Sequence, residues 1–181
     1  MKDKFYRAFF TSIIKEVENE TGQSILSSSA KDHNPTYSEL CLIGSTCREL
    51  NKFSYARWCF DRAFECTPKE LINHSMDNTM ETFIDETTGE EFFNFQINMD
   101  NLAHLQSYAL SGKANSYIAE GNSKGITETS LNEYIGFMNQ AIAICDSAIN
   151  IYEENEEAFF NKKAALSNIE YAKKQFQDLP Y

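Results

Sequence analysis

The stretch LIGSTCRELNKFSYARWCFDRAFECTP, residues 42–68, decides the fold. Small side chains recur in it at helical spacing beside large aromatic ones, the small ones being Gly44, Ala56 and Ala63. Small residues on facing helix surfaces let two antiparallel helices approach closely, and aromatic side chains fill the space beside them. With a tight turn expected at residues 51–52 and a helix stop at Pro68, the stretch predicts a helical hairpin that begins at Tyr37.

The spacing across this hairpin resembles one tetratricopeptide repeat, a unit of about 34 residues folded as two helices. The positions where the family carries Gly, Ala, an aromatic residue, a second Ala and Pro hold Gly44, Ala56, Phe60, Ala63 and Pro68. Leu40 and Cys47 replace the aromatic residues that are usual near the start of the unit. The resemblance implies a short right-handed array of helical hairpins, each packed on the next.

A second match lies near the C-terminus, in residues 141–155. Ala141 and Ala148 take the two small positions of a second repeat helix, Cys145 stands for the aromatic residue, and Glu153 stands where Pro is common. The next unit would begin close behind, with Phe159 in its bulky position. A last helix, from about residue 156 to 176, would be the polar-backed cap that repeat arrays need at their ends.

The first helix of this second repeat is expected between about residues 100 and 120. Its register is open, because either Gly112 or Ala114 can take the small position, and Gly121 as a turn glycine favours Ala114. An extra loop follows as far as Ser130. The sequence from Ser130 to Glu133 is a capping box, and it predicts the start of a helix that runs to about residue 152.

Two segments lie outside the repeats. An N-terminal helix is expected from about residue 2 to 19, with an apolar stripe formed by Tyr6, Phe10, Ile13, Ile14 and Val17. Residues 69–99 depart most from the family. Alternation near their end places Phe93, Phe95 and Ile97 on one face of a strand, which predicts a β-hairpin turning at residues 88–89; a helix broken at Gly89 is the alternative.

These segments make up a single all-α domain. It would consist of an N-terminal helix and loop (1–34), repeat 1 (35–68), an insertion (69–99), an interrupted repeat 2 (100–154) and a capping helix (155–181). The aromatic content, with 14 Phe and 9 Tyr, is far from that of disordered chains.

Composition narrows the choice of partners. The net charge of −11 disfavours nucleic acid and anionic membrane surfaces, and it is compatible with a basic protein partner. No apolar stretch reaches the length of a membrane span. The 5 cysteines form no Cys-x-x-Cys pair, as expected for free thiols in a reducing cytoplasm.

No catalytic, cofactor or metal site is expected. The histidines His33, His74 and His104 lie in separate segments with no metal-binding spacing. The acidic residues 85–86 and 90–91 lack the pattern of an EF-hand loop, and there is no phosphate-binding loop or nucleophile elbow.

The resemblance to tetratricopeptide arrays implies a groove that binds a protein or peptide partner and is lined by the first helix of each unit. The positions that match are Ser38, Cys41, Ser45, Arg48, Glu49, Tyr108, Ser111, Asn115, Ile118, Glu157, Phe160 and Asn161. Members that grip the C-terminal carboxylate of heat-shock chaperones use paired Lys and Asn at such positions. Because Cys41 with Ser45, and Ser111 with Asn115, stand at these places, the cationic half of that clamp is missing.

The expected function is therefore a non-catalytic adaptor or scaffold that holds a partner protein. A secretion-type chaperone or a toxin-immunity protein is an alternative of the same kind. The alternatives of other classes are a structural subunit of a larger complex, and an enzyme whose site would lie near the acidic residues 85–91. Exposed apolar ends of a short array also suggest a homodimer or a complex subunit.

Overall fold

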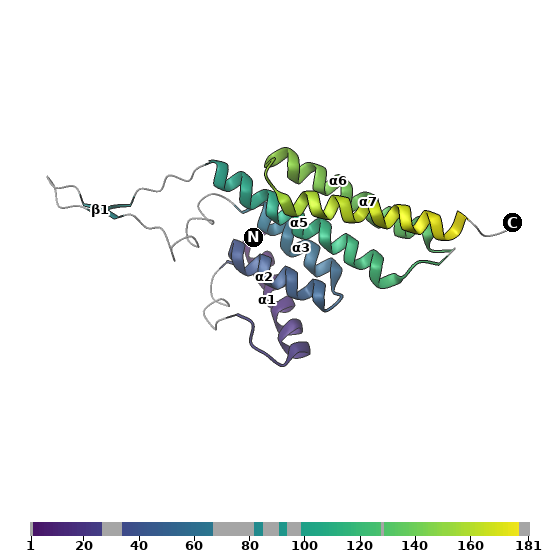
Figure 1. Cartoon of the computed structure of the whole chain (residues 1–181). Helices are drawn as coiled ribbons and strands as arrows, with labels where there is room; N and C mark the ends of the chain where they lie inside the picture. Colours follow the sequence, from purple (N-terminus) through teal and green to yellow (C-terminus); the bar gives the residue numbers. More distant parts are fainter. Residues whose placement is uncertain are drawn as a thin grey trace.

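The fold is all-α, as the sequence predicts. The computed structural model describes residues 2–26, 34–66, 82–84, 91–93, 99–127 and 129–177. Its helices follow one another along the chain as α1 (Lys2–Thr21), α2 (Tyr37–Glu49), α3 (Phe53–Phe64), α5 (Met99–Lys124), α6 (Leu131–Ile151) and α7 (Glu156–Gln177) (Figure 1).

The helices pack as stacked hairpins. Helix α2 pairs with α3, and α5 pairs with α6. The second helix of each hairpin packs on the first helix of the next, α3 on α5 and α6 on α7. The first helices also meet one another, because α5 contacts both α2 and α7. The same pattern of contacts thus occurs twice along the chain.

The first hairpin begins and turns through local side-chain chemistry. The Thr36 hydroxyl accepts a hydrogen bond from the Glu39 amide, and the Glu39 carboxylate accepts one from the Thr36 amide, both at 3.0 Å. This capping box satisfies amides at the start of α2. Asn51 adopts a left-handed φ of 59° between α2 and α3, a conformation that Asn tolerates better than most residues. The expected turn at residues 51–52 is confirmed.

Two predictions about the second hairpin are wrong. Gly121 is not a turn residue: α5 continues to Lys124, and Gly121 lies against Met138 of α6. The glycine with a left-handed φ, +70°, is Gly125. Ser130 precedes α6, but its hydroxyl does not cap the helix, because it bonds back to the amide and hydroxyl of Thr127. Because the Ser130 hydroxyl takes part in this turn, it does not accept the helix amide that a capping box requires.

Two short strands lie in the segment where the sequence predicts an insertion. β1 (Thr82–Ile84) pairs antiparallel with β2 (Glu91–Phe93), with Phe83 opposite Phe92. Strand pairing therefore occurs where the sequence predicts a hairpin. The expected turn at 88–89 and the residues Phe95 and Ile97 lie outside the described residues.

The ring of Phe60 in α3 is held between two glycines. A Cβ atom on Gly44 of α2 would lie 3.2 Å from this ring, and one on Gly112 of α5 would lie 2.3 Å from it. The ring is buried together with Cys59 and Ala109. Ala114 instead packs in the cluster that α5 builds with α6 and α7. Both candidates for the small position are thus used, on different sides of α5.

Aromatic residues of α1 pack on α3 at the edge of the first hairpin. Trp58 of α3 packs edge-to-face on Phe9 at 4.8 Å and lies near Tyr6 and Phe10. Lys52, at the start of α3, pairs with Glu16 at 2.7 Å and with Glu20 at 2.9 Å.

A buried asparagine, Asn155, links the start of α7 to α5. The Asn155 amide nitrogen donates to the hydroxyls of Ser107 and Ser111 at 2.6 and 3.0 Å. Its oxygen accepts the amide of Ala158 at 2.9 Å, which is the geometry of a helix N-cap. Ser107 donates in turn to the Ala148 carbonyl of α6. One side chain therefore caps α7 and joins it to the preceding hairpin.

The contact between Phe60 and Gly112 predicts opposite effects for two glycine-to-alanine substitutions. Gly112→Ala should destabilise the chain by about 1–3 kcal/mol, because the ring cannot retreat without meeting Gly44. Gly136→Ala in α6 should stabilise it by up to about 1 kcal/mol, since a Cβ there meets nothing within 4 Å. Urea unfolding monitored by circular dichroism measures both. Equal effects at the two positions would contradict the close packing.

The Asn155 network predicts a graded loss of stability. Asn155→Ala removes the cap and leaves two buried hydroxyls without their donor, so we expect a loss of about 2–4 kcal/mol. Asn155→Ser keeps an oxygen that can cap α7 and should lose about half as much. The free energies of unfolding of the two variants test this order. If Ser were no better than Ala, the cap would contribute nothing.

Candidate functional site

Helices α2 and α5, each the first of its hairpin, form one continuous side of the array together with α7. The hydroxyl of Tyr37 in α2 donates to the Leu105 carbonyl of α5 at 2.7 Å. The side-chain amide of Asn161 in α7 donates to the Ser111 carbonyl of α5 at 3.3 Å. The structure thus brings together helices that are more than 100 residues apart in the chain.

Most of the groove residues predicted from the sequence have exposed or half-buried side chains on this side. We call them the first-helix face, and they are Ser38, Cys41, Ser45, Arg48, Glu49, Tyr108, Asn115, Glu157 and Phe160. Ser111, Ile118 and Asn161 are buried. Ser111 and Asn161 join α5 to α7, and Ile118 packs against Met138 in the core. These three residues support the face from behind and offer a partner no surface.

A half-buried carboxylate connects α7 with α2 on this face. Burial raises the pKa of Glu157 above its ordinary value, while the charge of Arg48 and a hydrogen bond with Asn161 act in the opposite direction. The negative charge of Glu157 also helps to raise the pKa of the Cys41 thiol. Arg48 and Cys41 of α2 therefore lie within electrostatic reach of α7, and the face spans from the first hairpin to the last helix.

Aromatic rings give the face its apolar character. The ring of His104 packs edge-on against Tyr108, with centroids 4.6 Å apart, and against Tyr152 at 4.9 Å. Phe160 is 72% exposed. Sequence reasoning treated His104 as a lone histidine and missed this aromatic group. The one available signal was the spacing of four residues between His104 and Tyr108, which places both on one side of a helix.

The cysteine of this face is not an activated nucleophile. All five cysteines are free thiols. Burial raises the pKa of Cys41 to about 11, so it stays protonated at neutral pH. Cys47, Cys59, Cys66 and Cys145 are buried. A reactive cysteine needs the opposite shift, toward the thiolate.

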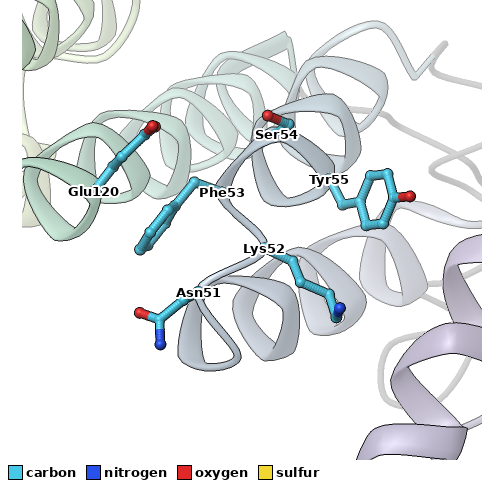
Figure 2. A pocket seen from close by; sticks show the side chains of 6 residues that line it. All are labelled: Asn51, Lys52, Phe53, Ser54, Tyr55 and Glu120. Carbon is cyan, nitrogen blue, oxygen red and sulfur yellow. The ribbon is translucent and has the colours of Figure 1, made fainter. Parts of the chain in front are cut away.

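A separate hollow of about 250 Å³ lies at the turn between α2 and α3, beside the end of α5. Figure 2 shows Glu120 and Phe53 on one side of it, with Lys52 and Tyr55 pointing the other way. Its charged groups already have partners: Lys52 pairs with Glu16 and Glu20, and Glu120 with Arg57 and Lys124. The hollow therefore offers a ligand no free charge, and the first-helix face is the better candidate site.

Several expectations concern residues outside this face. His33, His74 and the acidic residues Asp85, Glu86 and Glu90 lie outside the described residues. Within the part of the chain that the structure describes, no three His, Cys, Asp or Glu side chains gather as metal ligands. No described helix is long and apolar enough to cross a bilayer.

Comparison with protein-family models, with curated proteins and with solved structures finds no match to this chain.

The raised pKa of Glu157 predicts a pH-dependent gain from Glu157→Gln. Because the folded chain holds this proton more tightly, the carboxylate costs stability at neutral pH and costs none below the pKa of an exposed Glu, about 4.3. Glu157→Gln should therefore raise the melting temperature at pH 7, and the gain should shrink as the pH falls toward that value.

The matched control is Glu156→Gln, one residue earlier in the first turn of α7 and exposed. It removes the same charge from the same helix end, so it should be neutral or slightly destabilising. Thermal unfolding of both variants between neutral and acid pH measures the difference. A gain shared by both variants would show that burial of Glu157 is not its cause.

Proposed function

We propose that this chain is a non-catalytic, tetratricopeptide-like interaction module that holds a partner protein along its first-helix face. The observation that carries the proposal is the meeting of α2, α5 and α7 on one side, where Arg48, Tyr108 and Phe160 are accessible above a buried polar layer. A surface on stacked rigid helices holds its side chains in place, and this lowers the ordering cost of binding.

The chemistry of the face indicates the kind of partner. Exposed aromatic rings are the side chains that most often dominate binding energy at protein interfaces, and the face has Tyr108 on α5 and Phe160 on α7. The chain as a whole carries a net charge of −11, which steers basic partners toward it. A peptide segment with apolar side chains and a net positive charge fits both features.

Carboxylate recognition of the heat-shock type is not part of the proposal. Cys41 and Ser45 stand at the matching positions of α2, and neither side chain carries a positive charge at neutral pH. Ser111, the next matching residue, is buried under Asn155.

The test is partner capture with matched variants. The wild-type chain, the double variant Glu49→Ala/Tyr108→Ala and the control Gln140→Ala are used to isolate binding proteins from the native source. Gln140 is exposed on α6, outside the first-helix face. A partner identified with the wild type should bind the control equally and the double variant at least about tenfold more weakly, since truncation of an interface aromatic residue often costs over about 1 kcal/mol and the charge of Glu49 no longer attracts the basic partner.

Affinities are measured on the purified pair by calorimetry, with helix content checked by circular dichroism. Equal binding of the double variant by a partner of the wild-type chain would place the binding site elsewhere. Recovery of a retained small molecule without any protein partner would contradict the adaptor function itself.

A further inference from the structure

Helix α7 carries an exposed stripe that no described helix covers. Its residues share one side of the helix at alternating steps of four, three and four positions, and they are Phe160, Ala164, Ser167 and Tyr171. The outer two are strongly exposed, Phe160 at 72% and Tyr171 at 58%. Spacing of this kind forms the seam along which two helices pair. We call these four residues the α7 seam.

The kinds of residue along the α7 seam follow the same order in both directions, with an aromatic residue at each end and two small residues in the middle. If a second α7 is laid antiparallel on it, Phe160 meets Tyr171 of the other copy, and Ala164 meets Ser167. The small residues let the two helices approach closely at the centre, while the aromatic rings fill the space at both ends. A surface that complements itself in this way suits a two-fold symmetric contact.

The charges beside the seam are self-complementary as well. Lys163 and Glu170 flank the seam on the same side. Antiparallel pairing therefore places Lys163 of one copy beside Glu170 of the other, and Glu170 of the first beside Lys163 of the second, as flanking residues do in antiparallel helix pairs. Both side chains are exposed and form no ion pair with the described residues. At the helix ends, Lys174 would lie near the acidic first turn that holds Glu156 and Glu157.

Helix α7 does not share the acidic excess of the whole chain. The chain carries a net charge of −11, whereas α7 has one more Lys than Glu. Like charges at other surfaces would oppose self-association. We propose that a second copy of this chain docks antiparallel on the α7 seam, with two symmetric ion pairs between Lys163 and Glu170.

The experiment is a charge swap followed by sedimentation equilibrium from micromolar to near-millimolar concentration. Lys163→Glu alone sets two carboxylates against each other across the contact, and Glu170→Lys alone sets two ammonium groups against each other. Each should raise the dissociation constant of the dimer about tenfold, since two pairs change from attraction to repulsion. The double variant Lys163→Glu/Glu170→Lys should return to within about threefold of the wild type.

Two further variants make the result specific. Phe160→Ala/Tyr171→Ala should also raise the dissociation constant about tenfold or more by removing the apolar ends. Lys15→Glu changes the net charge as Lys163→Glu does, but on the exposed side of α1, and it should leave the dimer within about twofold of the wild type. Circular dichroism confirms that each variant is folded, since all these side chains are exposed.

A chain that stays monomeric over the whole range overturns the proposal. So does a dimer that the single charge reversals leave unchanged, or one that the double variant fails to restore. The test is independent of the partner-binding proposal, because its readout is self-association of the purified chain and needs no other protein.

Discussion

The packing of one aromatic ring sets the spacing on which the rest of the array depends. Phe60 lies between Gly44 of its own hairpin and Gly112 of the next. Because neither glycine has a Cβ, α2 and α5 can approach the ring from both sides, and α5 contributes Ala109 to the core of the first hairpin. The contact of α2 with α5 follows from this approach. That contact in turn creates the first half of the first-helix face.

The second half of the face depends on polar contacts. Ser107, Ser111 and Asn155 are buried, and each makes hydrogen bonds that link α5 with α6 or α7. A buried amide without partners would be costly, so this network defines a single position for α7. The position decides which residues of α7 join the face, Glu157 and Phe160, and which remain outside it, the rest of the α7 seam. The positions of the α7 residues in the binding surface and in the self-docking surface therefore depend on this buried network.

The sequence predicts the helices well, because their boundaries depend on patterns that are local. The limits of α1, α2, α6 and α7 agree with the expected ones to within a few residues. The errors at Gly121 and Ser130 arise where a nearby competitor wins: Met138 packs on Gly121, and Thr127 takes the hydroxyl of Ser130. The Asn155 network was not predictable in this way. Its members are 44 and 48 residues apart, and nothing local distinguishes a buried asparagine from a loop residue.

The candidate site shows the same division between pattern and packing. The resemblance to tetratricopeptide arrays supplied nine positions whose side chains are exposed or half-buried, because helical periodicity determines which side a residue faces. It could not tell which residues on that side would be covered by the next helix, as Ser111 and Asn161 are. Burial at a helix contact depends on the crossing of two helices, and that crossing is set by the sizes of distant residues such as Phe60 and Gly112. For this reason the wild-type packing, rather than the list of groove positions, decides which side chains remain free to bind a partner.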